Sequence, residues 1–320
     1  GLPAQLGGTS GDNCPLAWGS ACEHGTHVAG IAACNDVGAG DDGVGDLLPI
    51  IGMQIFSNFG GGAVLTYTSD QLKGMNRTIA LHDAGTPIGA VNMSLGGGRY
   101  FSAAACDSAN ASRKAAIDAL WSRGIATVIS AGNSGYTDSM GAPGCISTAV
   151  TVGATTDTDG FAWYTNSNSY MDFWAPGGAA SGAGTGVLSS VPTSANAYGE
   201  NSGTSLAAPA VAGAFALLKE CGAGPGEWSA TTINNRLHNF GLSLTRGITT
   251  NERIDVLAAT ATANLNDKLS RAEEVVLAGA GSSVTESDHT NCTTARDGAE
   301  PGEATIWYEV TPTVSGDMTV

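Results

Sequence analysis

The residue best placed to do chemistry in this chain is Ser205, in the segment 201–214, which reads NSGTSLAAPAVAGA. Gly203 and Thr204 carry little side-chain bulk, and the apolar run after Ser205 predicts a helix whose first turns tolerate Pro209. A serine at a helix N-terminus lies beside unpaired N–H groups and the positive end of the helix dipole. Such a hydroxyl is suited to attack a carbonyl carbon and leave an oxyanion, although Gly-Thr-Ser is also an ordinary helix N-cap.

Two upstream segments accompany the serine segment: residues 23–33 read EHGTHVAGIAA, and residues 129–135 read ISAGNSG. Together with GTSLAAP they resemble the histidine, oxyanion-asparagine and serine segments of subtilisin-like serine proteases (subtilases), in the same chain order. The resemblance extends over residues 14–260. An α/β-hydrolase is disfavoured, because its histidine follows the serine and because Ala207 stands where G-x-S-x-G needs its last glycine.

The resemblance implies a role for each matched residue. His24 would be the general base that takes the proton from Ser205, and Asn133 would donate its side-chain amide to the oxyanion beside the Ser205 N–H. An extended substrate could add as a strand along two segments. The residues that the resemblance places along this substrate are Ser94, Leu95, Gly96, Ser130, Ala131, Gly132 and Gly141.

Three further details follow from the same segments. Gly132 and Gly141 would leave the main specificity pocket open, which favours a large apolar side chain before the cleaved bond. Pro143, in GAPG, is expected to follow a cis peptide bond, as in relatives. Asn133 has a plainer alternative, since an Asn between Gly and Ser is typical of a turn.

His27 follows His24 by three residues and is predicted to be a buried, hydrogen-bonded histidine. Two histidines at this spacing also raise the alternative of a metal site. With no third ligand nearby, the metal site is the weaker interpretation.

The acid of a catalytic triad has no match in this chain. The family's aspartate lies in a D-[ST]-G segment at the end of a strand, upstream of the histidine, and no such segment precedes His24. Asp12 stands in polar loop sequence without an apolar strand before it, so we do not expect it to be the acid. We expect the aspartate to lie upstream of Gly1, and the chain by itself is predicted to be a weak or inactive enzyme.

An acidic, glycine-rich loop follows the histidine segment. Asp36, Asp41 and Asp42 supply the hard oxygen ligands that Ca²⁺ prefers, and many relatives bind calcium in a loop here. The spacing does not match an EF-hand, and a solvated acidic loop is the alternative. No cofactor is expected for the chemistry itself, so a bound calcium ion would be structural.

The seven cysteines form no close C-x-x-C pair, which argues against a zinc site and favours disulfides in an exported protein. Connectivity cannot be deduced from sequence, and the odd number leaves at least one cysteine without a partner inside the chain. We put forward Cys14–Cys22 and Cys106–Cys145 as hypotheses.

Composition narrows the class of protein. The net charge of −16, with 13 Lys and Arg against 29 Asp and Glu, argues against a nucleic-acid partner, which would need basic patches. No targeting segment is recognised, and the longest apolar run, Leu206–Leu218, is too short to span a bilayer. We expect a secreted, extracellular, bacterial protein that acts as a monomer on protein or peptide substrates.

Strands and helices alternate through the first part of the chain. Strands are predicted at Ile50–Phe56, Ile88–Leu95, Ile125–Ala131, Thr148–Ala154 and Val187–Val191, and helices at Gly25–Ala33, Ser69–Ala84, Ser112–Arg123, Leu206–Leu218, Ser229–Phe240 and Arg253–Ala263. This β-α-β-α-β order indicates an α/β fold with a parallel sheet and right-handed crossovers. Ligands of such sheets bind beyond the C-terminal ends of the strands, where 92–98 and 130–133 lie.

The character of the sequence changes near Asn264, so we predict a subtilisin-like, three-layer domain over 1–263, lacking its aspartate-bearing segment, and a second domain over 264–320. The second part alternates apolar and polar residues, as in ATIWYEVTPTVSGDMTV, and predicts β-structure. It resembles the start of the bacterial pre-peptidase C-terminal domain, a β-sandwich that would be incomplete here.

The sequence therefore predicts a secreted serine-type endopeptidase that cleaves proteins through an acyl-enzyme on Ser205. The alternative is a non-catalytic peptide-binding scaffold that kept the groove and lost the acid.

Overall fold

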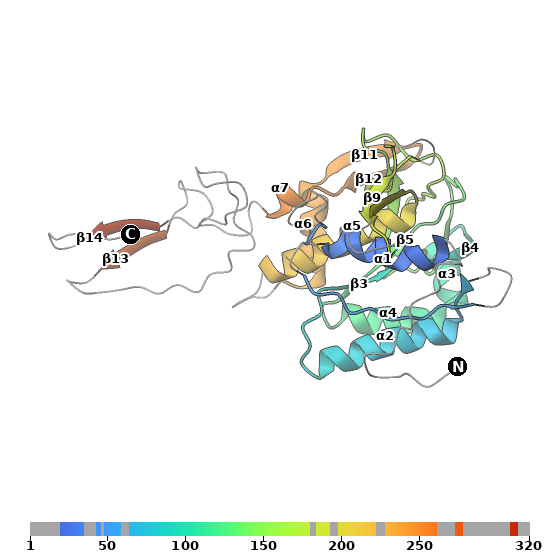
Figure 1. The fold of residues 1–320 in the computed structure, drawn as a ribbon, viewed down its shortest axis with the longest axis horizontal. Helices are drawn as coiled ribbons and strands as arrows, with labels where there is room; N and C mark the ends of the chain where they lie inside the picture. Colours follow the sequence, from blue (N-terminus) through green and yellow to red (C-terminus); the bar gives the residue numbers. More distant parts are fainter. Residues whose placement is uncertain are drawn as a thin grey trace.

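The computed structural model describes residues 20–34, 43–45, 48–58, 64–179, 184–192, 198–221, 228–260, 273–277 and 308–312. The helices are α1 (Ser20–Ala33), α2 (Thr68–Asp83), α3 (Ala103–Ala109), α4 (Ala111–Trp121), α5 (Thr204–Cys221), α6 (Ala230–Phe240) and α7 (Val256–Thr260). The strands are β1 (Ser57–Asn58), β2 (Val64–Leu65), β3 (Ala90–Met93), β4 (Gly97–Tyr100), β5 (Ala126–Ser130), β6 (Met140–Ala142), β7 (Val150–Thr155), β8 (Phe173–Pro176), β9 (Val187–Ser190), β10 (Tyr198–Asn201), β11 (Leu242–Arg246), β12 (Thr249–Arg253), β13 (Glu273–Leu277) and β14 (Tyr308–Pro312). Figure 1 shows how they are arranged.

The central element is a six-stranded sheet in the order β11-β12-β8-β7-β5-β3. Its strands from β3 to β12 are parallel, and only β11 pairs antiparallel, with β12. The predicted parallel α/β sheet is confirmed. Because β3 and β5 are parallel, their C-terminal ends open onto the same edge of the sheet.

Helices cover both faces of this sheet. The buried α5 packs against β3, β5, β7 and β8, together with α1, α6 and α7, while α2 and α4 pack together on the opposite face. Alternate residues of β5 divide between the two cores, because side chains of a strand point to opposite faces. Val128 belongs to the core beneath α5, and Ile129 belongs to the core with Ile117 and Leu120 of α4.

Several predicted elements are confirmed with shifts of one or two residues at their ends. α2 buries Met75 and half-buries Leu72 and Ile79 on one face, as its spacing predicts. α4 likewise buries Ile117 and Leu120. These segments follow the helical period closely, which explains why they could be predicted.

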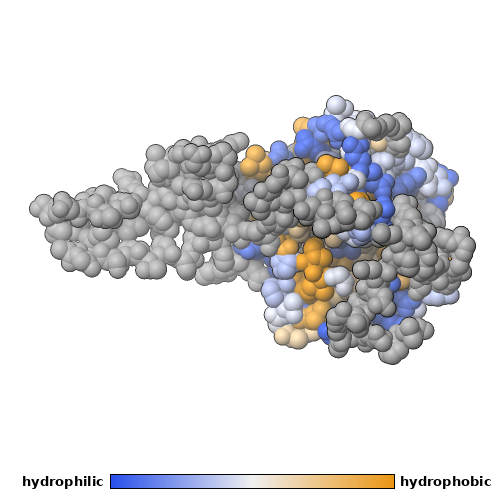
Figure 2. Space-filling model, viewed as in Figure 1, coloured by the Kyte–Doolittle hydropathy of each residue, from blue (hydrophilic) through white to orange (hydrophobic). Residues whose placement is uncertain are grey.

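The predicted buried strand at Ile50–Phe56 is wrong. Residues 48–56 form no strand, and Ile50 and Ile51 are 52% and 51% exposed. An apolar run becomes a strand only when a neighbour pairs with its backbone, and none of the described strands does so here. On the face of the molecule drawn in Figure 2, hydrophobic residues gather in a patch among hydrophilic ones.

The predicted helix at Arg253–Ala263 is wrong at its start, because Arg253 ends β12 and α7 begins only at Val256. The strand predicted at Val187–Val191 is confirmed as β9, which pairs with β10 in a separate hairpin. The sequence analysis did not predict β8, because Pro176 and the polar residues before Phe173 are not typical of a strand. In the structure β8 is buried between β7 and β12.

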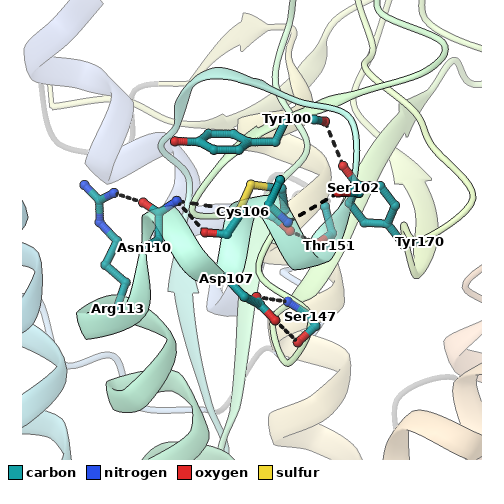
Figure 3. The surroundings of a disulfide bond; sticks show 12 residues. Tyr100, Ser102, Cys106, Asp107, Asn110, Arg113, Ser147, Thr151 and Tyr170 are labelled. Carbon is teal, nitrogen blue, oxygen red and sulfur yellow. Dashed lines mark hydrogen bonds between the residues drawn. A yellow bond between two sulfur atoms is a disulfide. The ribbon is translucent and has the colours of Figure 1, made fainter.

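The predicted disulfide between Cys106 and Cys145 is confirmed. It joins α3 to the segment after β6, and both cysteines are fully buried. Figure 3 shows the neighbouring contacts, in which Asp107 accepts hydrogen bonds from the backbone N–H and the hydroxyl of Ser147, at 3.0 and 2.7 Å. The expected cis bond before Pro143 is also present.

Some expectations lie outside the described residues. They are Asp12, the Cys14–Cys22 pair and the candidate calcium ligands Asp36, Asp41 and Asp42. Of the predicted β domain over 264–320, the structure describes only β13 and β14, which pair in parallel, so this domain stays a prediction.

Candidate active site

Ser205 lies in the first turn of α5, at the C-terminal edge of the sheet, as predicted. Its backbone carbonyl accepts a hydrogen bond from the Ser94 hydroxyl at 2.6 Å, and the Asn92 side-chain amide donates to that hydroxyl at 3.0 Å. Asn92 belongs to β3 and Ser94 follows it, so the end of this strand is tied directly to the start of α5. These two hydrogen bonds fix the backbone of Ser205, the residue that carries the hydroxyl.

The Asn133 side chain is held in one orientation. Its Oδ1 accepts from the Thr204 N–H at 2.9 Å and from the Thr204 hydroxyl at 2.7 Å, and the Thr204 hydroxyl in turn accepts from the Gly132 N–H at 3.1 Å. With Oδ1 engaged, Nδ2 points toward the serine turn, where a Cβ on Gly203 would lie 3.2 Å from it. The Thr204 N–H bonds Asn133 Oδ1 and the Leu206 N–H bonds the Gly203 carbonyl, so Asn133 Nδ2 and the Ser205 N–H are the donors at this place for which the described residues show no acceptor.

His24 and His27 lie on α1, which packs against α5. Near its start, α1 contacts the hairpin that leads into α5: His27 Nε2 bonds the Gly199 carbonyl at 2.9 Å. Further along, Gly213 of α5 packs so closely on α1 that a Cβ there would lie 2.8 Å from the Ala32 carbonyl oxygen.

These two contacts show that the helices run side by side in the same direction. Ala32 is eight residues beyond His24, and Gly213 is eight residues beyond Ser205. The structure therefore brings His24 and Ser205 to the same end of the helix pair, although they are far apart in the sequence. No hydrogen bond joins the His24 ring to the Ser205 hydroxyl in the described residues.

The pKa values of the two histidines are lowered, chiefly by burial. The proximity of His27 lowers the pKa of His24 further, and no carboxylate among the described residues bonds the His24 ring. His24 is therefore neutral at neutral pH and able to accept a proton. His27 is 2% exposed and carries the hydrogen bond to Gly199, which supports the predicted structural role.

The two predicted substrate segments lie side by side. Leu95 accepts a hydrogen bond through its carbonyl from the Ser130 hydroxyl at 3.4 Å, and Gly97, the residue after Gly96, pairs with Ala142 in the β4–β6 ladder. Gly132 has a φ of +105°, and a Cβ there would lie 2.4 Å from Asn166 Nδ2. A Cβ on Gly141 would lie 3.3 Å from the Gly97 nitrogen. Gly132 thus leaves room for the Asn166 side chain, and Gly141 allows close packing against the Gly97 backbone.

Sequence reasoning missed two residues that organise the site. Thr204 orients Asn133, as described above. Asn166 holds the loop after β5: its Oδ1 accepts from the Ser134 and Tyr136 N–H groups at 3.0 and 3.1 Å, and its Nδ2 donates to the Ala131 carbonyl at 3.0 Å. The GTS turn itself pointed to Thr204, whereas Asn166 stands in a polar stretch with no distinguishing pattern.

Two negative findings apply to the described part of the chain. It contains no group of three or more His, Cys, Asp or Glu side chains placed to hold a metal ion. Nor does any helix in it have the length and apolar character needed to cross a membrane.

The fold and site define a class: an α/β protein whose serine begins a buried helix at the C-terminal edge of a parallel sheet, beside a histidine helix and an oriented asparagine. Residues 18–269 match the model of the subtilase family (peptidase S8). The chain belongs to the subtilase family.

Similar proteins come from several organisms. The chain is 34% identical over 217 residues to the subtilisin-like serine protease AsES of Sarocladium strictum, which covers 67% of this chain and 48% of the relative. It is 32% identical over 222 residues to Subtilisin Savinase of Lederbergia lenta, covering 69% and 71%. Among solved structures, a protease of Pseudoalteromonas arctica matches with a TM-score of 0.62 at 32% identity, covering 75% of this chain and 71% of that one. The chain spans about half the length of the first of these relatives, AsES.

Proposed function

We propose that the protein is a serine endopeptidase that hydrolyses peptide bonds through an acyl-enzyme on Ser205. The observation that carries this proposal is the start of α5, where Ser205 lies beside an Asn133 amide whose oxygen is held by Thr204. The proposed base, His24, is carried by α1, which packs against α5. Family membership supports the same reaction.

Each group has a definite step in this reaction. His24, neutral because burial lowers its pKa, takes the Ser205 proton as the hydroxyl oxygen attacks the substrate carbonyl carbon. The oxyanion that forms is stabilised by Asn133 Nδ2 and by the Ser205 N–H. His24 then returns the proton to the leaving amine, and water hydrolyses the acyl-enzyme by the same route.

The substrate is proposed to add as an extended strand along Ser94, Leu95 and Gly96 on one side and Ser130, Ala131 and Gly132 on the other. This mode of binding is supported by the closeness of the two segments, which the Ser130–Leu95 hydrogen bond joins. Gly141 packs closely against the backbone of Gly97, which follows the first of these segments. Protein and peptide chains are thus the proposed partners.

The triad acid is proposed to come from a strand outside residues 1–320, because no D-[ST]-G segment precedes His24 in the sequence. In agreement with this, no carboxylate of the described residues bonds His24. We also propose secretion, supported by the Cys106–Cys145 disulfide, which suits an oxidising compartment. Calcium bound by Asp36, Asp41 and Asp42 remains a proposal that concerns stability and not the reaction.

The test is active-site labelling with a peptidyl phosphonate, followed by mass spectrometry, on this chain and its Ser205→Ala variant. Labelling of the native chain on Ser205, absent from the variant, supports the peptidase. Casein cleavage by a longer protein that includes the aspartate segment should exceed that of this chain by about 10⁴-fold, the scale of aspartate loss in subtilisin, a family member. The proposal would be contradicted if a folded, aspartate-containing protein showed no Ser205-dependent labelling or cleavage.

No carboxylate of the described residues bonds the His24 ring, which favours a second candidate, a non-catalytic peptide-binding scaffold. It predicts reversible binding of an extended peptide, measured by fluorescence anisotropy, with no covalent adduct in the longer protein. Since the peptidase would bind the same peptide, the covalent adduct is the outcome that separates the two candidates.

A further inference from the structure

Tyr164 carries a buried hydroxyl that the reaction described above does not use. The residue lies between β7 and β8 and is 5% exposed. Its hydroxyl lies 2.7 Å from the Gly177 carbonyl oxygen and 2.7 Å from the Gly178 carbonyl oxygen. One proton is therefore shared by two acceptors of the turn that follows β8.

That turn is joined to the serine turn. The Gly177 carbonyl that accepts from Tyr164 also accepts from the Gly203 N–H at 2.9 Å. Burial raises the pKa of Tyr164 to about 12, with a smaller opposing effect from the Gly203 backbone. The hydroxyl consequently keeps its proton and remains a donor at neutral pH.

Side chains cannot hold these two turns together, because their backbones are too close. A Cβ on Gly177 would lie 2.5 Å from the Ala154 Cβ and 2.8 Å from the Gly203 carbonyl oxygen. The two turns are therefore held by hydrogen bonds. Among the described residues, the Tyr164 hydroxyl is the only side-chain donor to the Gly177 and Gly178 carbonyls.

We propose that Tyr164 is a positioning residue for Ser205. Its hydroxyl holds Gly177 and Gly178, Gly177 holds Gly203, and Gly203 sets where the Ser205 hydroxyl and N–H stand relative to Asn133. This inference rests on the proposed function in so far as Ser205 is the nucleophile.

The first measurement is hydrogen–deuterium exchange of the Gly203 amide in Tyr164→Phe. This variant removes one oxygen atom and keeps the ring and the backbone bond from the Gly135 N–H to the Tyr164 carbonyl. Loss of the shared donor should speed exchange of the Gly203 amide by about tenfold. The matched control is Tyr170→Phe, which removes a hydroxyl that donates to the Tyr100 carbonyl at 2.8 Å, and should change Gly203 exchange less than twofold.

The second measurement separates positioning from simple stability. In Tyr164→Phe, the saturating rate of Ser205 labelling by a peptidyl phosphonate should fall by about five- to tenfold while the half-saturating concentration stays unchanged. Tyr170→Phe should alter neither quantity.

Unchanged Gly203 exchange in Tyr164→Phe overturns the inference. Faster exchange with an unchanged saturating rate also overturns it, since the hydroxyl would then serve stability alone. If neither this chain nor the longer, aspartate-containing protein is labelled, the proposed function has failed. Gly203 exchange then still decides whether Tyr164 holds the serine turn.

Discussion

Two regions that border the same sheet differ sharply in how they are held. The oxyanion region, which comprises β5, β7, β8 and the start of α5, has fully buried strands at β5 and β7 and an Asn133 fixed by Thr204. The edge region, which comprises residues 48–56 and β3, exposes Ile50 and leaves the buried Asn92 Oδ1 without a hydrogen bond in the described residues.

The difference shows that contacts within the described residues hold the Ser205 and Asn133 side of the site, but not the His24 side. The proposed nucleophile and the proposed oxyanion donors depend on hydrogen bonds inside the oxyanion region. For His24, by contrast, no hydrogen-bond partner among the described residues turns its ring toward Ser205. Catalysis should therefore be limited by the histidine side of the site.

The largest effect is expected from removing the disulfide behind the oxyanion region. Replacing both Cys106 and Cys145 by Ala releases a loop with a sequence separation of 39 residues. The free energy of unfolding should fall by about 4 kcal/mol, measured as a lower urea midpoint. A change below about 1 kcal/mol would show that the two segments are held by packing and by the Asp107–Ser147 bonds.

Asn133→Ala tests the oxyanion region directly. Labelling or cleavage at Ser205 should slow by about 10²–10³, the loss found when one oxyanion donor is removed from subtilisin, a member of the same family. Asn235→Ala, an exposed change on α6, is the control and should leave the rate unaltered. Equal rates for the two variants would mean that Asn133 serves only the turn.

Asp172 gives a pH-dependent test at the opposite end of β8. Its carboxylate accepts from the Thr151 N–H at 2.7 Å, and burial, opposed by that bond and by the charge of His238, raises its pKa from 3.8 to about 6. The folded state then binds more protons than the unfolded state between these values, so stability falls as the pH rises from about 4 to about 6.

Asp172→Asn should remove this slope and stabilise the protein at pH 7 by about 1–3 kcal/mol, measured by urea unfolding across that pH range. Asp157→Asn, at an exposed position, is the control. An unchanged slope in Asp172→Asn would show that another group titrates.

The smallest effect is expected in the edge region. Ile50→Thr and Ile51→Thr should each change the free energy of unfolding by less than about 0.5 kcal/mol, because both side chains are already half exposed. The matched buried change Ile129→Thr should cost several times more. Similar losses at Ile50 and Ile129 would contradict the contrast between the two regions.

The sequence by itself determined the α/β class, the helices α2, α4 and α5, and the candidates Ser205, His24 and Asn133. It could do so because helical periodicity and short, family-specific segments are local properties. The Cys106–Cys145 pair was a hypothesis that needed the folded chain, since cysteines 39 residues apart meet only through packing.

Only the tertiary structure decided the rest. Residues 50–56 carry a strand-forming sequence but no strand, and β8 is a strand despite its Pro, because backbone pairing depends on neighbours distant in the chain. For the same reason, only the structure shows the hydrogen bonds that Thr204, Asn166 and Tyr164 make around the site. Their hydrogen bonds cross between segments 13 to 71 residues apart, and no local pattern encodes such a contact.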